Sequence, residues 1–310
     1  MPRHHLQGAP AAKLLEAQAL TLQYLLANLC MNPARQRRRL RGLLAEASQL
    51  LHAGAELDRA LATEMERRRF HRFFTFVQVL VCSLFSLQML RLGSALGLYE
   101  TDELPAVYWA IWHFHRELSL WKEQVDAAKV KDDKKAAGGK KKGASSAASA
   151  AVKPRVLTYL DMVRSAEEHV ARGVYLTFLA ARAGGQYVPP VYEMQPPEAR
   201  WQQRFGCLPL FLTFERFAET VAADGRAPAA ALLEQALEAY RVAKQRLEAA
   251  AKSRGQLALE AETSYWRSLT RVAVINTLNL QTLQPDAPPG LSVDWSHNSF
   301  FPAISFAKKS

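Results

Sequence analysis

The sequence predicts a mainly α-helical fold, an irregular multi-helix scaffold of long amphipathic helices with a short β-leaning C-terminal tail. Apolar residues recur at spacings of three and four over long stretches, as they do on one face of a helix. Apolar residues make up 49% of the 310-residue chain and charged residues 22%, which is typical of a globular protein. Gly and Pro, at 15 each, are too few for the many turns of a β-sandwich.

The N-terminal region, residues 1–127, is expected to be helical. Its first helix covers residues 11–30, with leucines at helical spacing. Asn32 should cap the second helix and Pro33 should occupy its first position, because these residue types favour those positions. The start of this second helix is rich in arginine. We expect these arginines to form ion pairs within the fold or at an interface. A later helix, rich in aromatic residues, should begin at Asp102.

Residues 73–99 are the most apolar part of the chain and contain a single charged residue, Arg91. The segment is long enough to cross a bilayer, which takes about 20 apolar residues. Thr, Ser and Gln side chains interrupt it, however, and a helix buried on all sides in a bundle has the same composition. Burial in the core, without stable membrane insertion, is therefore the favoured interpretation, and a membrane-associated helical protein is the alternative.

A lysine-rich segment, residues 128–154, is predicted to be a flexible linker. It contains several glycines and a run of Ala and Ser, with too few large apolar residues to form a core. It carries much of the net charge of +11. The segment either keeps the chain in solution or docks on RNA phosphates, and a stand-alone basic protein that binds RNA or the ribosome is a further alternative. The candidate RNA contacts are Lys131, Lys134, Lys135, Lys140, Lys141 and Lys142.

The C-terminal region, residues 155–310, should contain further helices around a Pro-rich loop, with no evident internal repeat. Two Pro-Pro steps favour extended backbone in the loop, and two adjacent glycines should end the helix before it. The expected elements are, in order, a helix over 156–183, the extended loop over 187–209, a short helix over 210–221, two alanine-rich helices over 228–283 and the β-leaning tail over 291–306.

No catalytic constellation is recognisable. Gly184-Gly185 is typical of a helix C-cap and has the wrong spacing for an acetyl-CoA-binding turn. His113 and His115 are two residues apart on an expected helix, so they point in different directions and a shared metal ion is disfavoured. The cysteines, of which there are three, are widely spaced, which fits a reducing compartment such as the cytoplasm. We expect no catalytic, cofactor-binding or metal-binding residues and no small-molecule substrate.

The segment from Asn32 to Leu40 resembles the Asn-Arg-x-Arg-Gln-Arg-x-x-Leu signature of the large auxiliary, non-catalytic subunit of the N-terminal acetyltransferase C complex (NatC). Further features follow in the order of that family's C-terminal part, including the lysine-rich linker and the closing Asp294-Trp295-Ser296-His297 and Phe301-Pro302 steps. Pro33 stands where the family usually has Arg. The motif positions, expected to be structural or at an interface, are Asn32, Arg35, Gln36, Arg37, Leu40, Arg204, Phe205, Tyr240, Lys244, Asp294, His297 and Pro302.

This resemblance implies a helical scaffold that is not itself an enzyme. Members of the family wrap an acetyl-CoA-dependent catalytic subunit and a small Sm-like subunit, and they help to place both at the ribosome. The assembled complex acetylates N-terminal methionine co-translationally. The resemblance therefore implies a cytoplasmic auxiliary subunit whose partners are the catalytic subunit, the Sm-like subunit and the ribosome, possible ribosomal RNA contacts lying in the lysine-rich linker.

Overall fold

The structure is a computed structural model of the chain. It describes residues 5–43, 52–54, 56, 84–138, 159–190, 196–205, 208, 212–253, 260–283 and 290–306. The elements are α1 (His5–Leu29), α4 (Leu104–Gly138), α5 (Tyr159–Ala183), α6 (Pro197–Phe205), α7 (Phe214–Asp224), α8 (Ala229–Ser253), α9 (Glu260–Gln281), β1 (Leu291–Asp294) and β2 (Ala303–Phe306). Residues 33–43 and 84–95 are helical as well. The mainly α-helical prediction is confirmed.

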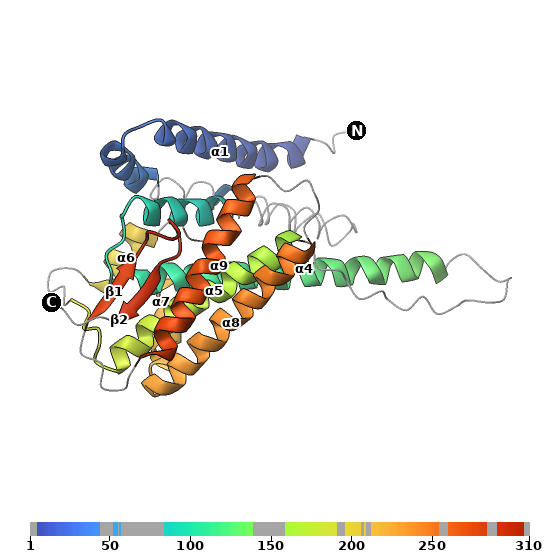
Figure 1. Cartoon of the computed structure of the whole chain (residues 1–310). Helices are drawn as coiled ribbons and strands as arrows, with labels where there is room; N and C mark the ends of the chain where they lie inside the picture. Colours follow the sequence, from blue (N-terminus) through green and yellow to red (C-terminus); the bar gives the residue numbers. More distant parts are fainter. Residues whose placement is uncertain are drawn as a thin grey trace, which may run out of the picture.

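Helix α5 lies at the centre of the fold and contacts α4, α8 and α9. In Figure 1, α5 and α8 run side by side, and α1 (blue) lies on the far side of the molecule from α8 (orange). The middle of α5 is buried on almost every side, with Val170, Val174 and Tyr175 fully enclosed. Gly173 lets α8 come close, because a Cβ atom added there would lie 2.7 Å from the ring of Tyr240.

The C-terminal tail forms the predicted β structure, a two-stranded antiparallel sheet in which Leu291 pairs with Phe306 and Asp294 with Ala303. Strand β2 packs on α9, and Asn276 of α9 joins the two. Its side-chain oxygen accepts a hydrogen bond from the backbone N–H of Ile304 (2.7 Å), and its amide nitrogen donates to the carbonyl of Pro302 (3.1 Å). The amide thus gives partners to buried backbone groups at the edge of the sheet.

The predicted helix start at Asn32-Pro33 is confirmed. Residue 33 is the first helical residue, and the side-chain oxygen of Asn32 accepts a hydrogen bond from the backbone N–H of Arg35 at 3.0 Å. This is the contact by which an N-cap residue satisfies one of the unpaired donors of the first turn. The Gly184-Gly185 stop is also confirmed, since α5 ends at Ala183 and Gly185 has a φ of 74°.

Two predicted boundaries are wrong. The stretch 187–209 is not extended throughout, because α6 occupies Pro197–Phe205. Pro197 takes the first helical position, where its missing N–H costs nothing, and the helix then buries Trp201 and Phe205 one turn apart. Helix α4 also continues beyond residue 127 to Gly138, since Ala and Lys are good helix formers. Residues 139–154 of the predicted linker lie outside the described residues.

The apolar segment 73–99 is described only from residue 84. There, Leu87, Met89 and Leu90 lie in the hydrophobic core, as the favoured interpretation expects. Across the part of the chain that the structure describes, no helix combines the length and the hydropathy that crossing a membrane requires.

Replacing Gly173 with Ala should lower the melting temperature. Alanine is favoured over glycine within a helix by about 1 kcal/mol. A methyl group 2.7 Å from the buried Tyr240 ring should outweigh that gain, since overpacking a core costs about 1–3 kcal/mol. Gly42→Ala is the matched control, because nothing lies within 4 Å of a Cβ added there, and it should keep or raise the melting temperature. Equal melting temperatures for the two variants would contradict the close approach of α5 and α8.

Candidate functional site

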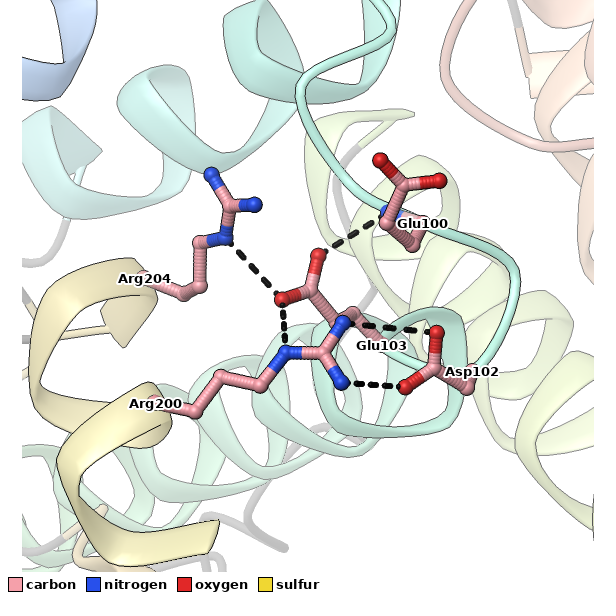
Figure 2. A network of polar contacts seen from close by, with 5 residues as sticks. All are labelled: Glu100, Asp102, Glu103, Arg200 and Arg204. Carbon is pink, nitrogen blue, oxygen red and sulfur yellow. Dashed lines mark hydrogen bonds and ion pairs between the residues drawn. The ribbon is translucent and has the colours of Figure 1, made fainter. Parts of the chain in front are cut away.

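The most connected polar side chain at the start of α4 is that of Glu103, which is 5% exposed. Its backbone carbonyl accepts hydrogen bonds from Ala106 and Val107, so Glu103 occupies the N-cap position. One carboxylate oxygen accepts the backbone N–H of Glu100 at 2.9 Å. The other accepts Nε–H groups from two arginines of α6, shown in Figure 2. Glu103 therefore caps α4 through its backbone carbonyl, and its carboxylate binds both the preceding loop and α6.

The arginines of α6 fix that helix to the start of α4. Arg200 lies 2.9 Å from Glu103 and 2.7 Å from Asp102, and Arg204 lies 3.0 Å from Glu103 (Figure 2). Charge-assisted hydrogen bonds of this kind are stronger than those between neutral groups. Arg204 was predicted from the sequence, whereas Arg200 and Glu103 were missed. The acidic pair before α4 and the arginines spaced four apart on α6 were the available signals.

The motif residue Phe205 completes the same junction. Its ring stacks on that of Tyr99 with centroids 5.6 Å apart, and it contacts Trp201 at 4.7 Å. Trp201 in turn meets Trp109 edge-on at 6.0 Å. Aromatic pairs in these geometries add stability beyond the area that they bury. The segments around Tyr99 and Phe205, far apart in the sequence, thus pack against each other.

A second buried carboxylate, Glu167 of α5, lies where several elements meet. A guanidinium nitrogen of Arg91 is 2.6 Å from it, Nε2 of His115 is 3.1 Å from it, and the hydroxyl of Tyr265 donates to it at 2.6 Å. Burial opposes ionisation of Glu167, but Arg91, with His115 and Tyr265, lowers its pKa to about 2. The guanidinium of Arg91 also lies over the Phe300 ring, 5.7 Å from its centroid. An ionised carboxylate paired in this way joins helices and is not available as a general base.

His113 of α4 also has a strongly shifted pKa. Burial lowers its pKa to about 4, despite the carbonyl oxygen of Trp109 at 2.9 Å from Nδ1. The ring packs against Trp109 and Trp112, with both pairs of centroids 4.4 Å apart. His113 and His115 make separate sets of contacts, as expected for residues on different faces. Among the described residues there is no group of three or more side chains suited to bind a metal ion.

The motif residues of the C-terminal region divide into buried and exposed ones. Tyr240 is fully buried against α5, and the carbonyl of the buried Pro302 accepts the bond from α9 already described. Asp294 lies at a turn, where it accepts hydrogen bonds from the backbone and side chain of Ser296, both at 2.8 Å. Nε2 of His297 lies 3.7 Å from Asp294. Lys244 is half exposed and forms only a surface pair with Glu248.

The motif that begins at Asn32 has a buried and an exposed face. Leu40 is fully buried in the core, whereas Arg35, Arg37, Arg38, Arg39 and Arg41 are exposed. Gln36 donates through its side-chain amide to the carbonyl of Leu29 at 3.2 Å and so ties the helix to the end of α1. Within the described residues, none of these arginines has a carboxylate within ion-pair distance, so the expected ion pairs are not seen there.

Three of these arginines border a pocket at the end of α1. Arg35, Arg38 and Arg39 line a hollow of about 560 Å³ together with Tyr24. The guanidinium of Arg39 lies over the Tyr24 ring, 5.9 Å from its centroid. The hollow is therefore cationic, with an aromatic wall contributed by α1, and suits an anionic group.

Of the six candidate lysines, the structure describes the backbone of three. Lys131, Lys134 and Lys135 lie on the last part of α4, where the backbone is described and the side chains are not. Lys140, Lys141 and Lys142 lie outside the described residues.

Replacing Glu103 with Gln should lower the free energy of unfolding by about 3–5 kcal/mol, because it removes the buried carboxylate charge that pairs with Arg204 and leaves Arg200 paired with Asp102 alone of its two carboxylates here. Chemical denaturation measures the change. Glu238→Gln is the matched control, since that side chain is 65% exposed and 3.8 Å from Arg241, and its loss should cost below about 1 kcal/mol. If both variants unfold at the same denaturant concentration, the network does not fix α6.

The chain is similar to proteins of the NatC complex in sequence and in fold, and it matches a family. The chain is 28% identical over 179 residues to N-alpha-acetyltransferase 35, NatC auxiliary subunit, of Rattus norvegicus, and 30% identical over 179 residues to that of Gallus gallus. Each match covers 56% of this chain but only 25% of the relative.

Among solved structures, the fold is similar to a chain of the apo NatC complex, with a TM-score of 0.62 and 14% identity. It is also similar to a chain of the NatC complex bound to Arl3 peptide and CoA, with a TM-score of 0.63 and 13% identity. The matches cover 95% and 96% of this chain and 48% of the other, so the chain spans about half the length of those subunits.

The family described as "NAA35-like, TPR repeats" matches residues 2–304, which is nearly the whole chain. The repeats named in that description are not evident in the sequence. The chain belongs to the NAA35-like family.

Proposed function

We propose that this chain is an auxiliary scaffold of a NatC-type N-terminal acetyltransferase complex and leaves the chemistry to a separate catalytic subunit. The observation that carries the proposal is the family match over residues 2–304, supported by relatives named as NatC auxiliary subunits. The chain corresponds to only 25% of those relatives, so its activity and partners are part of the proposal.

The use of the polar side chains supports a scaffold. Glu103 and Glu167, the two most enclosed carboxylates of the ion-pair clusters, each bind an arginine from another helix. Paired in this way, they join helices, as a rigid support for other subunits requires. The proposed partners are the acetyl-CoA-dependent catalytic subunit and the small Sm-like subunit. The complex would act in the cytoplasm on nascent chains with an N-terminal methionine.

We further propose that the lysine-rich segment contacts ribosomal RNA. Lys131, Lys134 and Lys135 lie in the last part of α4. Lysines bind phosphates as point charges and release counterions without reading a base sequence. Such contacts would place the complex near the emerging N-terminus.

Co-expression with the catalytic acetyltransferase subunit and the Sm-like subunit should give one complex that elutes together in size-exclusion chromatography. The chain alone should consume no acetyl-CoA above background, because bond making belongs to the catalytic subunit. Separate elution of the subunits, or turnover by this chain alone at an enzyme-like rate, would overturn the proposal.

Replacement of Lys134, Lys135, Lys140, Lys141 and Lys142 by Ser should weaken binding to ribosomes. It should also flatten the dependence of log K on log salt concentration, by about 0.7–0.9 for each phosphate that the segment no longer neutralises. Sedimentation with ribosomes over a salt series measures both. Arg246→Ser with Lys252→Ser, on exposed positions of α8, is the control and should leave binding unchanged. If the lysine variant keeps the wild-type slope of log K against log salt concentration, the segment is a spacer and does not contact RNA.

A further inference from the structure

The helix at 33–43 carries a dense positive charge that the described chain does not neutralise. Five of its eleven residues are exposed arginines: Arg35, Arg37, Arg38, Arg39 and Arg41. The helix contains no Asp or Glu, and within the described residues none of these arginines forms an ion pair. Like charges three or four residues apart repel each other on a helix, and a cation in the first turn, such as Arg35, opposes the helix dipole. An anion bound to these side chains would therefore stabilise the helix.

Three of the five arginines share the face of the helix that lines the hollow at the end of α1. Arg38 and Arg39 follow Arg35 at three and four residues, so the three side chains are neighbours on the helix surface. Gly42 continues this face, and nothing lies within 4 Å of a Cβ atom added there. The hollow of about 560 Å³ thus gathers three positive charges beside open space.

Helix α1 supplies the opposite wall of the hollow. Tyr24 and Met31 line it, and the guanidinium of Arg39 lies over the Tyr24 ring, 5.9 Å from the centroid. This contact holds Arg39 at the wall. Asn28, one turn beyond Tyr24, is fully buried, and among the described residues its side-chain oxygen and nitrogen have no hydrogen-bond partner. The junction of the two helices therefore contains guanidinium groups without a carboxylate and a buried amide without a hydrogen bond.

The guanidinium groups identify the chemistry of the ligand. Each is a planar fork that donates two parallel hydrogen bonds to a phosphate or a carboxylate and stays charged at physiological pH. A carboxylate carries one negative charge, whereas a phosphate monoester carries about −1.5 to −2 at pH 7 and has three strong acceptor oxygens. Three arginines at one hollow therefore match a compact molecule with two or more phosphate groups better than a single acidic side chain.

An RNA strand fits the hollow less well. A phosphate backbone bound without reading its sequence would contact the exposed arginines of the helix whether or not they line the hollow. Unpaired bases also stack on aromatic rings, and one face of the Tyr24 ring is already covered by Arg39. The hollow favours a compact ligand that Arg37 and Arg41 do not reach, because neither of them lines it.

We propose that Arg35, Arg38 and Arg39, with Gly42 and Tyr24, form a binding site for a compact ligand that bears two or more phosphate groups. The arginines bind the phosphate oxygens. Because the site takes residues from two helices, the bound ligand joins α1 to the helix at 33–43. Soluble polyphosphates and lipid headgroups share this chemistry. The site does not depend on the proposed function, because its residues all belong to this chain.

Inorganic pyrophosphate, added to the full chain at constant ionic strength, tests the site. It should raise the melting temperature by a few degrees, because a ligand that binds only the folded state stabilises it. Arg35→Gln with Arg38→Gln should weaken pyrophosphate binding, measured by calorimetry, on the order of tenfold or more, since charge-assisted hydrogen bonds are lost. Arg37→Gln with Arg41→Gln removes the same charge outside the hollow and should bind within about twofold of the wild type, because salt screens distant charges.

Gly42→Glu tests the site while keeping every arginine. The new carboxylate would lie four residues after Arg38 and three after Arg39, where it pairs with them and competes with phosphate. Binding of pyrophosphate should weaken on the order of tenfold, as it would on loss of a charge-assisted hydrogen bond. Gly42→Gln is the matched control, similar in size but uncharged, and should bind more tightly than Gly42→Glu. Circular dichroism of each variant checks that the chain still folds.

Vesicles distinguish the two sources of phosphate. If the chain floats with phosphatidylcholine vesicles that contain phosphatidylinositol bisphosphate, and pyrophosphate or the Arg35→Gln, Arg38→Gln change prevents it, the ligand is a lipid headgroup. If the chain binds pyrophosphate and does not float with these vesicles, the ligand is a soluble compound.

Three results would overturn the site. Pyrophosphate at millimolar concentration could leave the melting temperature of the wild-type chain unchanged, which would mean that the hollow binds no phosphate. The two arginine pairs could weaken binding equally, which would assign it to the net charge of the helix, as for an RNA strand. Equal binding by Gly42→Glu and Gly42→Gln would place the anion outside the hollow.

Discussion

The ion pair between Glu167 and Arg91 fixes the arrangement of the helices around it. It joins α5 to the helix at 84–95, and the contacts of Glu167 with His115 and Tyr265 add α4 and α9 to the same point. Two opposite charges enclosed in this way each lose most of their hydration, so neither can leave the other at low cost. A shift of α5 or of the helix at 84–95 by one turn would leave a buried charge alone. Glu103 has a similar role at the start of α4, where it binds two arginines of α6.

The elements that the sequence predicted well are those decided by neighbouring residues. Asn32 and Pro33 carry their own capping chemistry, and Gly185 takes a conformation that few other residues tolerate. The Pro-Pro step at 196–197 misled the prediction because its second proline starts a helix as easily as it prolongs a loop. The polar junctions could not be predicted, since Glu103 and Arg200 are separated by 97 residues and Glu167 and Tyr265 by 98. Local periodicity says nothing about which of many charged residues will pair over such distances.

The same limit applies to the candidate site. Most motif positions turned out to hold the fold, as Leu40, Phe205 and Tyr240 do through burial and Arg204 through an ion pair. Periodicity alone treats the leucines of α1 as one apolar set. Burial divides them, with Leu14 inside and Leu22 and Leu26 in solvent. Because both subsets have helical spacing, only the packed structure distinguishes the buried leucines of α1 from the exposed ones.

Strongly shifted pKa values often mark active sites, but here their physical causes indicate otherwise. Burial raises the pKa of Glu167, but the adjacent Arg91 lowers it more, to about 2. Burial, in a site where the ring packs against two tryptophans, lowers the pKa of His113 to about 4, so its imidazole is neutral at neutral pH. Both groups are nearly inaccessible, so they cannot exchange a proton with a substrate. The accessible features of the described chain are of a different kind: the leucines of α1 and the arginines beside them. An exposed surface that presents apolar side chains and charge in this way is suited to contacts with other proteins.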